Sequence, residues 1–597
     1  MKSEKQTTAP MTELEKNIYS VLETYSNVHR GSGHNSQVTS KLYDQARSIV
    51  LDYLGLPASD YIVIFSTPRR AALMVKGINP EKYVVVSSED LGLSLGVRAV
   101  ALKKGILPQN LHCFSGGGTA RLVSPGWVIW SKGPERYEPG TPAIINIIAF
   151  TRALILSREH GKSEFINGNI LNSDQILNED NLSLFSGRMM LEELRKTIIG
   201  RDLEVTTVHG QAKYINLDNA ASTRTFIPVW DAVRKTLSQG KEVKNQIIGA
   251  VRQLIMEFTG APLSEYDVIF TSNTTEAISL AAESLSLEQE KGTFVVNTIL
   301  EHNSNELPWR SFPGLSLLRI KADKNGFLDL AELEELLSGY NKKNVPGTNR
   351  IELVTITGAS NVLGTFNDLE AISQIVHKYG ARLLVDAAQM IAHRSIDIKK
   401  CAIDYLAFSG HKVYAPFGAG VLVVRKGLLR FSTDEFSFIN SSGDENAAGI
   451  AGLGKSIVLL QRVGMDVIHD EEKELTSYAV KSMSTVKGMT LYGINDPDSR
   501  LFISRGSVIS FSLKEKLANK VAKTLADRGI GVRSGCHCAH ILVKYLVNIP
   551  PYLEQFQGFL LKLFPKLSLP GIVRVSIGIE NNKKEIDLLV RELQRIA

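Results

Sequence analysis

Cysteine and long apolar runs are scarce in this sequence. Only 4 of its 597 residues are cysteine, which excludes a disulfide-rich secreted fold and is typical of a reducing compartment. No run of about 18 apolar residues occurs, and the candidate at residues 142–156 is interrupted by Asn146, Thr151 and Arg152. The N-terminal residues are polar and contain no signal-peptide hydrophobic region. We therefore expect a soluble cytoplasmic protein with no membrane segment.

An excess of one charge is also lacking. There are 68 basic and 62 acidic residues, so the net charge of +6 is too diffuse to indicate a nucleic-acid partner. Apolar residues make up 44% of the chain, which is typical of a well-packed globular protein. The length alone suggests about four domains, so the motifs must decide how the chain is divided.

One lysine lies between two apolar runs. The tetrapeptide Ser409-Gly410-His411-Lys412 follows the run at residues 405–408 and precedes the run at residues 420–424. A buried lysine loses its proton because desolvation disfavours the ammonium form, and a neutral amine forms a Schiff base with an aldehyde. A lone lysine of this kind is also compatible with a solvated surface group, so its interpretation depends on the segment upstream.

A carboxylate ends the strand predicted just before that lysine. Residues 381–386 are typical of a buried parallel strand and end in Asp386, with Gln389 three residues later. Ligands of open α/β sheets bind at the carboxyl ends of the strands. Pyridoxal phosphate needs a carboxylate there, since its protonated ring nitrogen makes the ring an electron sink. The pairing of Asp386 with Lys412 therefore indicates a pyridoxal-phosphate site.

Four further motifs, in the same order along the chain, resemble one known family. They are residues 216–221 (Asn-Leu-Asp-Asn-Ala-Ala), 271–277 (Thr-Ser-Asn-Thr-Thr-Glu-Ala), 301–305 with Pro308-Trp309, and 360–364 (Ser-Asn-Val-Leu-Gly). From about residue 215 onward the sequence resembles the class V aminotransferase superfamily of fold type I pyridoxal-phosphate enzymes, and within it the cysteine desulfurase and selenocysteine lyase group. The resemblance implies an α/β fold, with a mostly parallel seven-stranded sheet between helices and a small α/β C-terminal domain.

The resemblance assigns roles around the cofactor ring. Lys412 would form the Schiff base, and Asp386 would pair with the pyridine nitrogen. Gln389 would bond the phenolic oxygen, and His302 would stack on the ring and take part in catalysis. Asn361 would lie near both the cofactor and the substrate carboxylate.

The resemblance also assigns the groups that bind anions. Arg574 would grip the carboxylate of the amino-acid substrate, a task that suits a planar guanidinium, and Arg533 would help it. The phosphate would be held by hydroxyls, backbone N–H groups at a helix N-terminus and an imidazole, from Thr274, Thr275, Ser409 and His411.

Residues 532–539 (Val-Arg-Ser-Gly-Cys-His-Cys-Ala) choose the reaction. They resemble the Arg-x-Gly-x-x-Cys-Ala loop of the desulfurases, which places Cys538 where a thiol attacks substrate sulfur. The resemblance implies that Lys412 removes the α-proton, Cys538 keeps the sulfur as a persulfide, and alanine is released. A sulfur-acceptor protein would then be a partner. We expect His537 and Arg533 to lower the pKa of the Cys538 thiol.

Other interpretations of this loop stay open. Cys536 and Cys538 are half of a potential metal motif, but Cys113 and Cys401 form no second pair, so we expect no metal. Cys538 is alternatively an inert thiol in a class V lyase or transaminase with another substrate. The chain is alternatively a pseudoenzyme scaffold that binds the cofactor without turnover.

The N-terminal region repeats part of the later sequence. Residues 47–65 align with residues 252–270 at a constant offset of 205, and 8 of the 19 positions are identical. Residues 1–160 are therefore predicted to be a degenerate partial copy of the same fold. Residues 161–213 would be a connector with a helix from Ser186 to Ile199, residues 214–500 the large domain, and residues 501–597 the small domain.

The first copy keeps segments that the second one lacks. Residues 27–31 resemble the family's Asn-x-His-Arg-Gly segment, and residues 136–141 resemble its Arg-x-Glu-x-Gly-Thr segment. In the family these segments reach across a dimer interface into the partner's site. We therefore expect an intramolecular pseudo-dimer in which His29 and Arg30 contact the substrate and Thr141 contacts the phosphate. Whether two chains also form a homodimer stays open.

Overall fold

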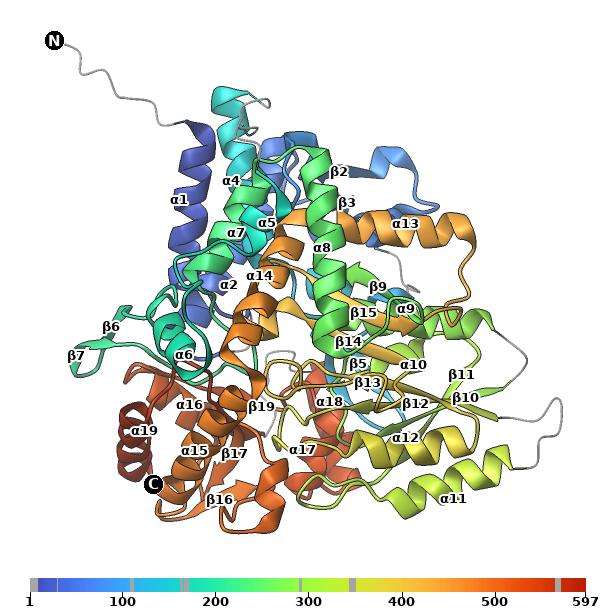
Figure 1. Cartoon of the computed structure of the whole chain (residues 1–597), viewed down its shortest axis with the longest axis vertical. Coiled ribbons are helices and arrows are strands. Elements are labelled where there is room, and N and C mark those ends of the chain that lie inside the picture. The colour runs from blue at the N-terminus through green and yellow to red at the C-terminus, as the bar shows by residue number, and fades with distance from the viewer. Residues whose placement is uncertain are drawn as a thin grey trace.

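The computed structural model describes residues 9–28, 31–107, 112–161, 165, 171–288, 292–342, 350–563 and 571–597. Its centre is a seven-stranded sheet in the order β11-β10-β12-β13-β14-β15-β9 (Figure 1). The strands from β11 to β14 run parallel, whereas β15 is antiparallel to both β14 and β9. The predicted mostly parallel seven-stranded sheet is therefore confirmed. The strands are β9 (Tyr266–Thr271), β10 (Thr293–Thr298), β11 (Leu315–Ile320), β12 (Arg350–Thr357), β13 (Arg382–Asp386), β14 (Tyr405–Ser409) and β15 (Gly420–Arg425).

Alternate residues of the central strands enter two separate cores, because successive side chains point to opposite faces of a sheet. In β13, Leu383 and Val385 belong to one hydrophobic cluster and Leu384 to the other. Both faces are therefore buried under helices, as continuous apolar strands predict. The helices of this region are α7 (Ile227–Leu237), α8 (Lys241–Thr259), α9 (Thr274–Leu287), α10 (Leu307–Ser311), α11 (Leu330–Asn341), α12 (Leu369–Lys378), α13 (Thr433–Asp444) and α14 (Ala447–Val463).

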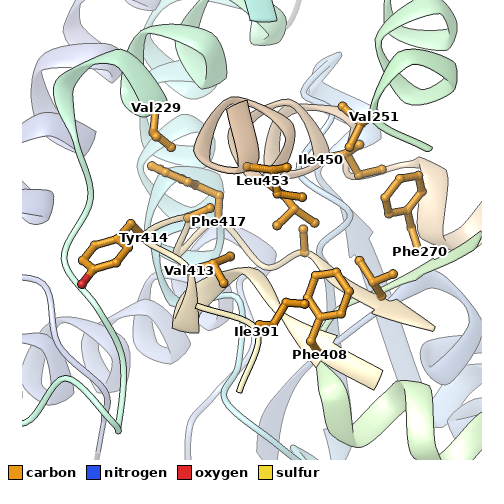
Figure 2. Close-up of a cluster of buried hydrophobic side chains, with 14 of the residues drawn as sticks. Val229, Val251, Phe270, Ile391, Phe408, Val413, Tyr414, Phe417, Ile450 and Leu453 are labelled. Atoms are coloured by element: carbon orange, nitrogen blue, oxygen red, sulfur yellow. The ribbon is translucent and has the colours of Figure 1, made fainter. Parts of the chain in front are cut away.

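The chain segment after Lys412 is anchored in the first of these cores. Val413, Tyr414 and Phe417 are buried there, below Ile450 and Leu453 of α14 (Figure 2). Burying side chains of this size contributes roughly 1.5–3 kcal/mol each. The backbone that follows Lys412 is therefore held in place by the hydrophobic core.

The C-terminal part forms a second α/β layer around a four-stranded sheet in the order β16-β17-β20-β19. Its core includes Ala479 and Met483 of α15 and both Ile509 and Val575 of the sheet. The boundary predicted at residue 500 is too late, because β16 already pairs with β17. The elements are α15 (Met465–Met483), β16 (Met489–Tyr492), β17 (Val508–Leu513), α16 (Ala518–Ala526), β18 (Ile530–Gly531), β19 (Arg533–Gly535), α17 (His540–Leu546), α18 (Pro551–Leu563), β20 (Ile572–Ser576) and α19 (Lys583–Ile596).

The connector packs on α14. It contains α5 (Ser173–Leu177), α6 (Gly187–Lys196) and the hairpin of β6 (Glu204–Thr207) and β7 (Gly210–Lys213), and the two-residue strand β8 (Ile215–Asn216) follows. The predicted helix is shorter than expected: it ends at Lys196, and Ser186 stands at the N-cap position without a side-chain cap bond. Met190, Leu191 and Leu194 form its buried face, as predicted.

The N-terminal region contributes a three-stranded sheet in the order β1-β3-β2. Val63 of β1 lies in the first core of the large sheet and Ile64 in the second, so both cores continue into this region. Its elements are α1 (Pro10–Glu23), α2 (His34–Leu54), β1 (Tyr61–Ser66), α3 (Pro68–Val75), β2 (Tyr83–Ser87), β3 (Arg98–Lys103), β4 (Ala120–Val123), β5 (Val128–Trp130) and α4 (Ile144–His160). Within the described ranges, no helix combines the length and apolar character needed to cross a membrane.

Candidate active site

A cavity of about 510 Å³ opens where the sheet, the C-terminal layer and the N-terminal region meet. Described residues that were predicted for the site all line it: Thr141, Thr274, Thr275, His302, Asn361, Asp386, Gln389, Ser409, His411, Lys412, Arg533, Cys538 and Arg574. His29 and Arg30 lie outside the described residues. The sequence motifs, which span more than 400 residues from Thr141 to Arg574, therefore converge on one space.

Lys412 lies directly after β14, in a short 3-10 turn (Gly410–Lys412). Its Nζ donates to the carbonyl oxygen of Ala220 and, at 3.0 Å, to that of Ala221. Gln389 Nε2 also donates to the Ala220 carbonyl, at 2.8 Å. These contacts aim the amine at the turn after β8, inside the cavity.

The electrostatics of the cavity favour the neutral amine. Burial lowers the pKa of Lys412 to about 7, and the positive charges of Arg574 and Arg533 act in the same direction. Burial likewise lowers the pKa of His411 well below its usual value. A neutral amine is the form that attacks an aldehyde carbon.

Asp386 stands at the carboxyl end of β13, where the sequence predicted a partner for a ring nitrogen. Burial raises the pKa of its carboxyl group, opposed by a hydrogen bond from the Ala388 backbone N–H. A buried carboxylate with a raised pKa gains from a cationic partner. A protonated pyridine nitrogen is such a partner.

His302 also lines the cavity and lies beside a glycine. Its Nδ1 accepts from the backbone N–H of Ser304 at 3.1 Å, so the ring carries its proton on Nε2. A Cβ added at Gly117 would approach the His302 ring to 2.7 Å. Gly116 is even closer to Thr275, because a Cβ added at Gly116 would lie 2.1 Å from Thr275 Cγ2. A side chain at either glycine would therefore collide with His302 or Thr275.

A helix N-terminus closes one end of the cavity. Asn273 caps α9 by accepting from the Glu276 N–H, while Ser409 Oγ accepts from the backbone N–H of Thr274 at 2.7 Å. Asn273 Nδ2 also donates to the carbonyl oxygen of Thr141, at 3.1 Å. Thr141 therefore meets the start of α9 from the N-terminal region, and hydroxyls and helix N–H groups gather where an anion is favoured.

Two arginines share one carboxylate at the other end. Arg533 Nε donates to Asp218 Oδ2 at 2.9 Å, and Arg574 Nη2 donates to Asp218 Oδ1 at 3.1 Å. All three side chains are buried. Because two guanidinium groups face a single carboxylate, this end keeps an excess positive charge that suits one substrate carboxylate.

The Cys538 loop is held in an uncommon backbone conformation. His537 and Cys538 have φ of 50° and 54°. Asn361 Nδ2 donates to the His537 carbonyl at 2.9 Å, and the Asn303 N–H donates to the Cys538 carbonyl at 2.6 Å. Non-glycine residues adopt positive φ only where the surroundings enforce it, so these bonds aim the half-buried Cys538 into the cavity.

The expectation that His537 lowers the pKa of the Cys538 thiol is wrong, whereas the same expectation for Arg533 stays a prediction. Burial and the nearby charges of Arg574 and Arg533 lower the pKa of His537 well below its usual value. The ring is therefore neutral and does not stabilise a thiolate as a cation. Its Nε2 lies 3.1 Å from the carbonyl oxygen of Ile572, which fixes the ring instead.

Two residues of the site, Asp218 and Asn27, had no role predicted from the sequence. Asp218 unites the arginines, and Asn27 donates to Thr141 Oγ1 at 3.1 Å. Both residues lie inside motifs that resemble the family, so the sequence did mark them as candidate site residues. Among the described residues, no group of three His, Cys, Asp or Glu side chains lies close enough to hold a metal ion.

Fold and cavity together define a class: an α/β protein with a desolvated lysine, a carboxylate at a strand end and a helix N-terminus around one cavity. The aminotransferase class-V family model matches residues 215–589. The chain belongs to this family.

Several proteins that are similar to this chain are named cysteine desulfurases. A probable cysteine desulfurase from Halalkalibacterium halodurans is 30% identical over 442 residues, covering 68% of this chain and 98% of that one. A cysteine desulfurase from Enterobacter sp. is 33% identical over 370 residues, covering 58% and 81%. Among solved structures, the cysteine desulfurase from Thermococcus onnurineus matches with a TM-score of 0.54 and 26% identity, covering 68% of this chain and 97% of that one. A cysteine desulfurase from Escherichia coli, at 22% identity and a TM-score of 0.52, covers 64% and 94% and shares the fold.

Proposed function

We propose that this protein is a pyridoxal-phosphate-dependent cysteine desulfurase that converts L-cysteine to alanine and leaves a persulfide on Cys538. The observation that carries the proposal is the convergence of Lys412, Asp386, Arg574 and Cys538 on one cavity. The curated relatives named cysteine desulfurase support the same reaction.

The residues of the cavity fit the cofactor. Asp386 would pair with the ring nitrogen, Gln389 would bond the phenolic oxygen, and His302 would stack on the ring. The phosphate would lie at the N-terminus of α9, bound by Thr141, Thr274, Thr275, Ser409 and His411. Pyridoxal phosphate, when bound, supplies an aldehyde and a ring that withdraws electrons from the substrate α-carbon.

The remaining chemistry belongs to side chains of this protein. Arg574, with Arg533 and Asn361, would bind the substrate carboxylate and so orient the Cα–H bond toward Lys412. Because the pKa of Lys412 lies at about 7, a substantial fraction of the amine is neutral at pH 7, and this neutral form would remove the α-proton. Cys538 would attack the substrate sulfur: the Cβ–S bond breaks, an S–S bond forms, and the product leaves as alanine after its Cβ takes up a proton and the α-proton returns to its Cα.

We further propose that residues 1–160 act as a degenerate half of an intramolecular dimer. Three features of their strands support this. The first residue of β1 precedes the first residue of β9 by 205 positions, and the last residues of the two strands are also 205 positions apart. β2 and β3 precede β14 and β15 by 322 residues at both ends. The pairing of β3 with β1 and β2 repeats the antiparallel pairing of β15 with β9 and β14, residue for residue.

Reciprocal contacts between the halves support a pseudo-two-fold axis. α4 and α14 have 17 residues each and lie 303 positions apart. A Cβ added at Gly96 would lie 2.9 Å from Asn446 Cβ, and one at Gly418, 322 positions later, would lie 2.3 Å from Ala143 Cβ. Ala143 precedes Asn446 by 303 positions, so each contact is the image of the other, which is the signature of an isologous interface.

In this proposal the first half binds no cofactor of its own and only completes the site of the second half. Asp90 occupies the position that corresponds to Lys412 at the offset of 322, so the first half has no lysine for the cofactor. It would instead supply Thr141, with His29 and Arg30, to the site in the second half. A sulfur-acceptor protein would receive the persulfide sulfur.

The experiment that tests the desulfurase proposal measures alanine and sulfide from L-cysteine in the presence of a reducing thiol. We expect equal amounts of both products from the wild type, near-complete loss in Cys538→Ala, and retained activity in Cys536→Ala, the matched control two residues away. Activity in Cys538→Ala would contradict the role of that thiol. Cofactor binding without products would favour a scaffold or another class V reaction.

A further inference from the structure

The segment between α1 and α2 reaches the turn that holds the reactive lysine. Asn27 Nδ2 donates to Thr141 Oγ1 at 3.1 Å and to the carbonyl oxygen of Ala221 at 3.3 Å. The same Ala221 carbonyl accepts from Lys412 Nζ at 3.0 Å. One amide of the N-terminal region therefore touches both the hydroxyl proposed for the phosphate and the carbonyl partner of the amine.

A second contact of this segment leads to the same turn. Tyr25 Oη and Ser222 Oγ are 2.7 Å apart, and Ser222 Oγ donates to the His411 carbonyl at 3.2 Å. The residue next to Lys412 is thus also bonded, through Ser222, to the N-terminal region. The turn at residues 220–222 is therefore bonded both to the N-terminal region and to the turn that carries Lys412.

The orientation of the Asn27 amide is fixed. Its Oδ1 accepts from the backbone N–H of Val28 at 2.8 Å. A backbone N–H only donates, so the Nδ2 end must face Thr141 and Ala221. The backbone is fixed as well, because the Asn27 carbonyl accepts from Ser36 Oγ of α2 at 2.7 Å.

We infer that Asn27 is a positioning residue that couples the phosphate end of the site to the amine of Lys412. The inference rests on the proposed function. Thr141 Oγ1 accepts from Asn27, so the hydroxyl proton stays available for an anionic oxygen. The Ala221 carbonyl accepts from Asn27, so it is a weaker acceptor for an ammonium group, which favours the neutral amine.

The substitution Asn27→Asp isolates this role. Aspartate has the same shape and still accepts from Val28, but it lacks both N–H donors and places a negative charge beside Ala221. Asn27→Ala removes the contacts without adding charge. Gln37→Ala is the matched control, since Gln37 lies on α2 and its exposed side chain donates to the Ser32 carbonyl at 2.9 Å.

The first readout needs no cofactor. In cofactor-free protein, the pH dependence of Lys412 acylation by an amine-directed reagent, followed by peptide mass spectrometry, reports its pKa. We expect a midpoint near pH 7 in the wild type and in Gln37→Ala. In Asn27→Asp the midpoint should rise by about one unit or more, because a nearby opposite charge favours the ammonium form. Equal midpoints in Asn27→Asp and wild type would overturn the inference.

The second readout uses the cofactor. We expect the dissociation constant of pyridoxal phosphate to rise about tenfold or more in Asn27→Ala and in Thr141→Val, with less than additive loss in the double variant because the two groups act through one contact. Additive losses would contradict the coupling. If the wild type bound no cofactor, the proposed function would fail, while the acylation midpoints would still decide the role of Asn27.

Discussion

At the scale of single residues, the protonation of Lys412 governs how fast the site reacts with an aldehyde. Its pKa of about 7 lies below the ordinary value of 10.5, so the amine is mostly neutral above pH 7 and charged below it. Only the neutral form is nucleophilic. We predict that the rate of cofactor uptake falls about tenfold per pH unit below pH 7 and levels off above it.

Stopped-flow absorbance at a series of pH values measures this profile. A midpoint near pH 10, the range of an exposed lysine, would contradict the burial described for this amine. The same shift affects folding with a defined sign: between pH 7 and 10.5 the unfolded chain binds more protons at this group, so its contribution to stability rises with pH across that window.

The residues that line the cavity were largely predictable from the sequence, because each stands in a short motif. Lys412 and Asp386 each follow an apolar run that forms a central strand, and strand ends of a parallel sheet meet at one edge. The protonation of His537 was not predictable. It depends on burial and on two arginines, one from β19 and one from β20, which only the folded chain brings beside it.

At the scale of elements, the connector is held to α14 by a buried ion pair. Lys455 Nζ donates to the carbonyl oxygen of Leu177 at 2.9 Å and forms an ion pair with Asp180, which Arg462 Nη1 also contacts at 2.7 Å. The side chains of Lys455 and Asp180 are 1% and 5% exposed. Removing one partner of a buried ion pair leaves the charge of the other partner buried and uncompensated.

We therefore predict that Asp180→Asn lowers the free energy of unfolding by about 3–5 kcal/mol. Glu193→Gln is the matched control, because its pair with Lys196 is on the surface and is worth less than about 1 kcal/mol. Urea unfolding of both variants measures the difference. Equal stability of the two variants would show that this pair does not fasten the connector.

Element boundaries show where sequence reasoning reached its limit. The terminal helix Lys583–Ile596 carries local signals in its sequence, namely an apolar period and the N-cap residue Asn582. The helix predicted from Ser186 to Ile199 ends at Lys196, since Ile198 pairs instead with Phe226 through a β-bridge. That competing contact is tertiary and leaves no mark in the local pattern.

At the scale of the whole molecule, we propose that both halves of one chain build a single site. Thr141 belongs to the first half and Thr274 to the second, and both line the cavity. We predict one bound cofactor per chain. We also predict that Thr141→Ala raises the dissociation constant of the cofactor about tenfold or more, because a hydrogen bond to a charged group is lost.

Thr207→Ala, on the exposed connector hairpin, is the control for that variant. Isothermal titration of cofactor-free protein gives both the stoichiometry and the affinity. Two cofactors per chain, or an unchanged affinity in Thr141→Ala, would count against a shared site.

The proposed repeat at the offset of 205 has a signal in the sequence because 8 of nineteen aligned positions are identical, most of them in the turn and the strand. The offsets of 322 and 303 were not visible, since β2, β3 and α4 share shape with β14, β15 and α14 but few identical residues. In the proposed duplication, the backbone register would have been kept while the side chains changed.

The most direct test of the central claim locates the lysine that joins the cofactor. Borohydride reduces a lysine–aldehyde linkage to a stable secondary amine, and peptide mass spectrometry then identifies the modified residue. We expect a phosphopyridoxyl group on Lys412 in the wild type, and none at that position in Lys412→Arg. Modification of a different lysine, or no modification of the cofactor-saturated wild type, would contradict it.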